Sequence, residues 1–141
     1  MSVLITMDRV TRTGVSLEPE LLKKFDEIIE RRGYSSRSEA IRDLIREEII
    51  RDEIDAGGKD AVGTITIIYE HDTGDATHKL LHIQHNNYLK ISSTMHVHLD
   101  RDRCLEVLFA RGKASEIKDL AEKIRAVKGV KFGEACITTL L

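Results

Sequence analysis

The sequence predicts an α+β protein built in two parts, and three observations carry this prediction. A strand-like segment over residues 12–17 precedes two stretches whose apolar residues recur at helical spacing. The composition changes at Gly57-Gly58, the only Gly-Gly pair of the chain. After it, strand and helix patterns alternate to the end of the sequence. We therefore expect a first domain at residues 1–56, a hinge at 57–61 and a second domain at 62–141.

The first domain contains two expected helices. One begins at Pro19 and ends before Gly33, because proline suits a first helical turn and glycine suits a left-handed cap. The next follows Ser36, which forms a Ser-x-x-Glu capping box with Glu39, and its apolar stripe continues to Ile54. A strand and two helices of about 50 residues are too small to bury a sizeable core alone.

The single strand of this domain lacks a partner within its own half of the chain. We expect it to pair with a second copy, giving an intertwined homodimer whose two-stranded ribbon enters the major groove of double-stranded DNA. At the start of the second helix, Ser36, Arg37 and Ser38 offer N–H groups, hydroxyls and a guanidinium to a phosphate oxygen. The alternative is an ordinary solvated helix start. Residues 1–55 carry 10 Lys and Arg against 13 Asp and Glu, so general attraction to phosphate is not expected.

The second domain has the pattern βαββαβ. The expected strands are 62–70, 92–99, 104–111 and 130–139, and the expected helices are 76–88 and 114–127. Two strand–helix–strand units with a hairpin between them are typical of the ferredoxin-like split βαβ fold.

The hairpin in the middle of this domain gathers three possible metal ligands. A turn at residues 100–102 sets His98 opposite Cys104, and His96 shares their face because side chains alternate along a strand. The other face takes apolar residues, which we expect in the core, so that the histidines point outward. These apolar residues are Met95, Val97, Leu99, Leu105, Val107 and Phe109.

Two imidazoles and a thiol on one surface suit a transition metal. The bland alternative is two solvated histidines and a small, semi-buried cysteine. A zinc finger is not expected, since no second Cys or His cluster of the required spacing is present. His85, at the end of the helix before the hairpin, is the natural fourth donor, from the same chain or from a neighbouring one. His71, His78, His82 and Cys136 are interpreted as structural or solvated residues.

Composition excludes several classes of protein. The formal net charge of −2 favours neither a membrane surface nor bulk nucleic acid. No apolar stretch reaches 18 residues, and residues 1–7 are too short and polar for a signal peptide. Two scattered cysteines fit free thiols in the cytoplasm. An enzyme is not expected, because no nucleophile–base pair or phosphate-cradling glycine loop is evident.

The run Arg-Ser-Glu-Ala-Ile-Arg-Asp at residues 37–43 resembles the second helix of a ribbon–helix–helix repressor. Together with Gln84-His85, His96-Val97-His98 and Cys104-Leu105-Glu106, it resembles the NikR family of nickel-responsive regulators over residues 10–141. The resemblance implies a homotetramer, in which ribbon–helix–helix dimers flank four ferredoxin-like domains of the ACT type.

The resemblance also implies a planar Ni²⁺ site that bridges two subunits. Its ligands are His96, His98 and Cys104 of one chain and His85 of another, with Gln84 and Glu106 as partners that orient the imidazoles. A secondary cation site at Glu39 and Asp43 is implied as well.

The groove-facing ribbon positions implied by the family are Arg12, Gly14 and Ser16, where the family usually has Arg, Thr and Thr. The function so implied is metal-dependent repression of nickel uptake genes through operator DNA. One alternative is a metal sensor with weak or altered DNA binding that acts through other partners. An antitoxin-type ribbon–helix–helix protein, with a second domain that binds a protein or an amino acid, is a further alternative.

Overall fold

A computed structural model describes residues 10–140. The sequence predicts that the residues before Val10 form a short extension of the first domain, and this extension lies outside the described residues. The chain divides into two compact units between Asp43 and Leu44, and each is described by itself. The domain limits at residues 56 and 62 and the hinge between them stay predictions. No helix in residues 10–140 is long and apolar enough to cross a membrane.

The first unit contains helix α1 (Pro19–Arg32) and the first turns of α2 (Arg37–Ala56). Gly33 is left-handed at φ 75°, and its N–H caps the end of α1 as predicted. Half of the predicted capping box is present, because the Ser36 hydroxyl accepts the Glu39 N–H at 3.2 Å. The other half, a hydrogen bond from the Ser36 N–H to the Glu39 carboxylate, was predicted wrongly. This carboxylate instead accepts hydrogen bonds from the N–H of Ser35, at 3.3 Å, and from the Ser35 hydroxyl.

The strand expected at residues 12–17 is not formed in the single chain, where residues 10–18 are irregular and exposed. A strand exists only through hydrogen bonds to a neighbouring strand. The expected neighbour is a second copy of this same segment, which one chain cannot provide.

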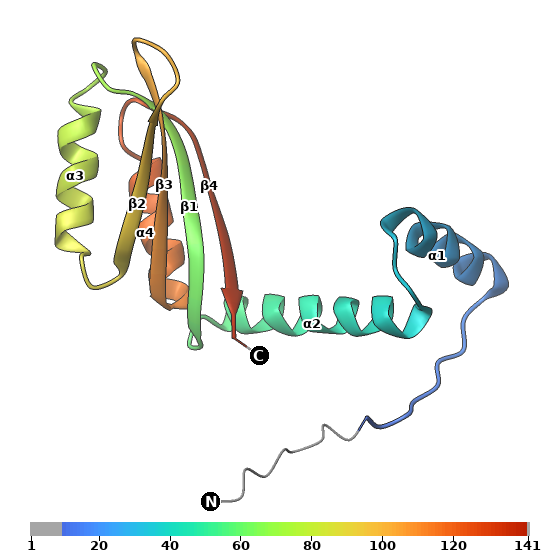
Figure 1. Ribbon diagram of the computed structural model, residues 1–141. Coiled ribbons are helices and arrows are strands. Elements are labelled where there is room, and N and C mark those ends of the chain that lie inside the picture. The colour runs from blue at the N-terminus through green and yellow to red at the C-terminus, as the bar shows by residue number, and fades with distance from the viewer. Residues whose placement is uncertain (1–9, 141) are drawn as a thin grey trace, which may run out of the picture. The chain divides into compact units, whose positions relative to one another are not determined.

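The second unit is a four-stranded antiparallel sheet in the order β2-β3-β1-β4, with two helices on one face (Figure 1). Its elements are β1 (Asp60–Glu70), α3 (Ala76–Asn86), β2 (Ile91–His98), β3 (Arg103–Lys113), α4 (Ala114–Arg125) and β4 (Val130–Thr139). This order confirms the predicted ferredoxin-like βαββαβ arrangement.

The core lies between the sheet and α3 and α4. Its largest fully buried apolar side chains come from two strands and both helices: Tyr69, Ile65, Ile67, Leu80, Leu108, Ile117 and Ile124. On β3 the buried positions are Cys104, Glu106, Leu108 and Ala110. The core face of the sheet is therefore the face that carries Cys104.

The expectation that the histidines point away from the core was wrong. His96 and His98 share the helix-covered face with Cys104 and stay exposed because they lie on the edge strand β2. The apolar residues expected in the core lie on the opposite, open face, where Met95 is 58% and Val97 is 41% exposed. That face also exposes Leu99, Phe109 and Phe132. The sheet thus has two apolar faces, and the helices of one chain cover only one of them.

Candidate metal centre

The β2–β3 hairpin has the register predicted from the sequence, with His98 opposite Cys104 and His96 opposite Glu106. The ligand atoms of His96, His98 and Cys104 all lie within 4.8 Å of one another. Cys104 Sγ is 3.3 Å from His98 Nδ1, and the two imidazole centroids are 4.9 Å apart. Within residues 10–140 these three form the only group of three or more such residues placed closely enough to hold a metal ion.

Cys104 is the buried member of this group, at 1% exposure, whereas both histidines reach solvent. Burial raises the pKa of the Cys104 thiol, and the nearby carboxylates of Glu106 and Asp100 raise it further. Without a cation the thiol therefore keeps its proton. A cation between the imidazoles and the sulfur would reverse this balance, because it stabilises the thiolate.

Glu106 lies opposite His96 on the neighbouring strand and is a buried carboxylate, at 6% exposure. It accepts a hydrogen bond from the Gln84 amide at 2.7 Å, and its other oxygen lies 4.0 Å from Nδ1 of His96. The Tyr69 hydroxyl also donates to it, and burial together with this carboxylate raises the pKa of Tyr69 to about 12. The carboxylate thus links helix α3, strand β1 and the exposed imidazole.

Sequence reasoning selected Gln84 and Glu106 but missed Tyr69. The Tyr69 ring meets the His96 ring edge-on, with centroids 6.2 Å apart. Its position opposite Cys104 on the adjacent strand places it on the same face as the three ligand candidates. The available signal was the strand alternation of β1, in which Ile65, Ile67 and Tyr69 share one face.

The turn of the hairpin is fixed by Asp100. Its carboxylate accepts the N–H groups of Asp102 and Arg103 at 3.0 and 2.8 Å and binds the Arg103 guanidinium at 2.7 Å. These bonds lower the pKa of Asp100 to about 2. His71 bonds the same turn through the Arg101 carbonyl at 2.8 Å, which agrees with its structural interpretation. Both strand ends that carry His98 and Cys104 are therefore held in place.

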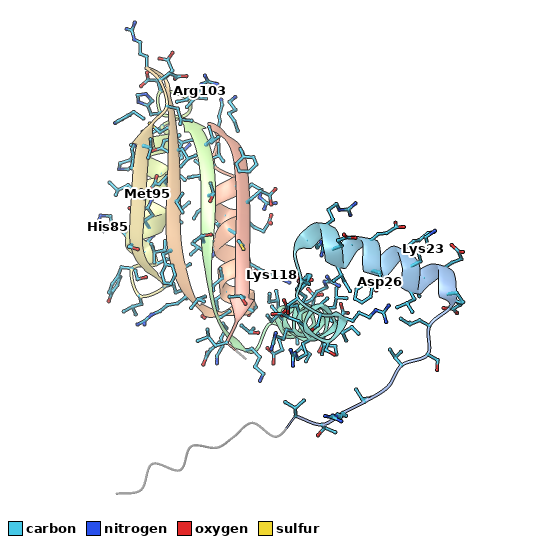
Figure 2. The ribbon with its side chains drawn as sticks, turned by 45° about the vertical axis from the view of Figure 1, so that its right-hand side comes forward. Lys23, Asp26, His85, Met95, Arg103 and Lys118 are labelled. Atoms are coloured by element: carbon cyan, nitrogen blue, oxygen red, sulfur yellow. The ribbon has the colours of Figure 1, made fainter. Side chains whose placement is uncertain are left out.

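His85 is exposed at the end of α3 and does not join the group formed by the hairpin of its own chain. In Figure 2 it lies beside β2, lower than Met95, whereas Arg103 marks the hairpin end at the top of the sheet. The groove around it, of about 260 Å³, is lined by residues of α3 and the start of β2. His85 is thus separated from the three-residue group of its own chain.

The residues expected to contact DNA lie in the first unit. Arg12, Gly14 and Ser16 are exposed. Arg37 forms a double hydrogen bond with Asp26, from Nε and from Nη2, each at 2.6 Å. A phosphate that binds Arg37 would therefore have to share its guanidinium with Asp26 or displace the Asp26 carboxylate from it.

The hydroxyl of Ser36 caps helix α2, and Ser38 is exposed. The two carboxylates expected at a secondary cation site, Glu39 and Asp43, are half-buried, and Glu39 bonds Ser35.

Two family models match this chain. The NikR C terminal nickel binding domain matches residues 62–138, and the ribbon-helix-helix protein, copG family, matches residues 11–52. Among known relatives, a protein of Thermococcus onnurineus is 50% identical over 131 residues, which cover 93% of this chain and 95% of the relative. A protein of Pyrococcus abyssi is 51% identical over 133 residues, which cover 94% of this chain and 96% of the relative. A protein of Geotalea uraniireducens is 46% identical over 133 residues, which cover 94% of this chain and 96% of the relative. All three carry the provisional name nickel-responsive regulator.

Proposed function

Because the chain belongs to the NikR family, with a copG-type ribbon–helix–helix domain followed by a nickel-binding domain, we propose that it represses nickel uptake genes when Ni²⁺ is bound. It is a regulator and not an enzyme. The observation that carries the proposal is the convergence of His96, His98 and Cys104 within 4.8 Å on a hairpin whose turn is held by Asp100.

The donor set fits nickel. Imidazole nitrogens suit first-row metals such as Ni²⁺ and Cu²⁺, and thiolate is a strong additional donor. When bound, the metal ion supplies a positive charge that stabilises the thiolate and connects the side chains that bind it. Cys104 would bind the metal as a thiolate, and the Glu106 carboxylate, 4.0 Å from Nδ1 of His96, would keep that imidazole in orientation. Gln84 connects the Glu106 carboxylate to helix α3, because its side-chain amide donates a 2.7 Å hydrogen bond to Glu106.

We assign His85 as the fourth ligand, supplied by a neighbouring subunit of a homotetramer. Two observations support this assembly. His85 lies outside the three-ligand group of its own chain, and the open face of the sheet exposes apolar side chains. A second chain packed on that face would bury Met95, Val97 and Phe132. In the first unit, Val15, Leu21 and Ile28 are likewise exposed and available to a partner chain.

The regulatory step is a linkage between metal and DNA. A site shared by two chains restrains them relative to each other, and a restraint that favours the DNA-binding arrangement couples both affinities. Coupling of about 1–3 kcal/mol changes operator affinity roughly 5–150-fold. The operator is read by Arg12 and Ser16 in the ribbon, with phosphate contacts from Ser36, Arg37 and Ser38.

Replacing Glu106 by glutamine is expected to weaken nickel binding about 10–100-fold, because a buried carboxylate that orients a ligating imidazole is lost. The measurement is a nickel titration in competition with a chelator. The control is Glu122→Gln, which removes an exposed carboxylate on α4 and should change nothing. Equal nickel affinity in Glu106→Gln and the unaltered chain would remove Glu106 from the site.

Replacing Arg12 by alanine is expected to weaken operator binding in the nickel-loaded protein. An arginine that reads a guanine in the major groove contributes about 1–3 kcal/mol of discrimination. The measurement is fluorescence anisotropy at fixed salt, with Arg51→Ala as a matched control in α2.

The second candidate, a metal sensor with altered DNA readout, is favoured by Gly14. This residue has no side chain to contact a base edge at a groove-facing position. If Arg12→Ala leaves DNA binding unchanged while nickel binding stays tight, this second candidate replaces the first.

A further inference from the structure

A groove between α3 and α4 lies outside the candidate metal centre and the residues expected to contact DNA. It has a volume of about 560 Å³, which is within the usual range for small-molecule sites. Three lysines line it: Lys79 from α3, and Lys123 and Lys128 from α4 and the segment that follows it. No acidic residue lines the groove, although the whole chain carries a formal charge of −2.

Two histidines one helical turn apart, His78 and His82, complete the polar lining. Such a pair can chelate a cation, but three ammonium groups around the same groove repel one. Each imidazole already has a partner: Nδ1 of His78 lies 3.6 Å from Asp75, and Nε2 of His82 lies 3.0 Å from the Asn86 amide nitrogen. The charge of the lining thus favours an anion over a metal ion.

Two of the lysines contact Gly74, one through its ammonium group and the other through its aliphatic stem. The Lys79 ammonium donates to the Gly74 carbonyl at 2.9 Å. The stem of Lys128 lies so close to Gly74 that an added Cβ would stand 2.9 Å from its Cγ and Cδ. Because Gly74 is left-handed at φ 62°, glycine suits both the turn and the close approach of this stem. Lysine side chains restrained by such contacts lose less conformational freedom on binding an anion than freely moving ones.

The remaining lining is apolar and consists of Ile83, Ala126 and Val127. Contact with a phosphate backbone requires cations but no apolar surface beside them. A small molecule with an anionic end and a flat, weakly polar ring would contact both the lysines and the apolar side chains of the groove. We therefore propose that the α3–α4 groove binds a nucleoside polyphosphate, with its phosphates on the lysines and its ring against the apolar side chains.

The test uses the full-length, nickel-loaded protein and ATP in excess Mg²⁺, so that the nucleotide does not extract nickel. We expect saturable binding by calorimetry, with a dissociation constant below about 1 mM. Nuclear magnetic resonance should show shifts of the His78 and His82 ring protons. The double variant Lys123→Gln/Lys128→Gln should bind ATP at least about tenfold more weakly, because charge-assisted hydrogen bonds are lost.

The matched control is Lys113→Gln/Lys131→Gln, which removes the same charge from exposed lysines outside the groove. This control should bind ATP as the unaltered protein does, and inorganic triphosphate should bind more weakly than ATP. Absence of ATP binding, or equal loss in both double variants, would overturn the proposal. Triphosphate binding as tight as that of ATP would overturn the nucleotide assignment. A groove variant that loses DNA affinity but keeps ATP affinity would assign the groove to DNA.

Discussion

The Cys104→Ala protein is expected to lose tight nickel binding and, with it, nickel-dependent binding to DNA. Cys104 is the only sulfur donor in the group, and its Sγ lies 3.3 Å from His98 Nδ1. Partners that merely orient a ligand change metal affinity about 10–100-fold, so removal of the thiolate itself should cost at least about 100-fold. A chelator competition assay measures the first loss, and fluorescence anisotropy with operator DNA measures the second.

The assembly should survive this substitution. Cys104 is 1% exposed and small, so alanine leaves only a minor cavity, which costs about 1 kcal/mol. Light scattering should therefore give the same tetramer mass for the variant. The matched control is Cys136→Ala, which removes the other cysteine, an exposed one, from β4. If Cys104→Ala still bound DNA in a nickel-dependent way, the assignment of the hairpin site would be wrong.

His85→Ala is expected to have a comparable effect, and mixing chains should reverse it. In our proposal each site takes three ligands from one chain and His85 from another. A heterotetramer of His85→Ala and Cys104→Ala chains then contains complete sites, formed where the hairpin of the first meets the His85 of the second. Neither homotetramer contains one, so tight nickel binding should reappear only after the two proteins are unfolded and refolded together.

The control for this experiment is His82→Ala, which removes another exposed histidine from the same helix. It should bind nickel normally. Refolding the two defective chains together without recovery of tight binding would show that His85 does not act across subunits. Tight binding in the His85→Ala homotetramer would remove His85 from the site altogether.

The hairpin register could be predicted from sequence, whereas the face on which the site lies could not. Register depends only on which residues share a face, and an alternating pattern gives this directly. In β2, Met95 and Val97 alternate with His96 and His98, and in β3 Val107 alternates with Glu106. Both faces of the sheet carry apolar residues, so the pattern does not say which face the helices of the same chain cover.

Two other features could not be predicted from the sequence pattern. Tyr69 was missed: the alternation of β1 could have indicated its inward face, but nothing in the sequence pairs its hydroxyl with Glu106. The strand expected at residues 12–17 is not formed in the single chain, because the neighbour that we expect to hydrogen-bond to it is a second copy of the same segment. The helices were easier to predict, since Pro19, Gly33 and Ser36 act through local backbone chemistry.

The central claim is that nickel and DNA binding are coupled in this protein. The most direct measurement is fluorescence anisotropy of DNA from the upstream region of the gene, titrated with protein with and without one equivalent of Ni²⁺. Salt must be fixed and stated, because phosphate contacts make the affinity salt-dependent. We expect tight binding only with nickel, and roughly 5–150-fold weaker binding without it. Equal affinity in both conditions would contradict the claim.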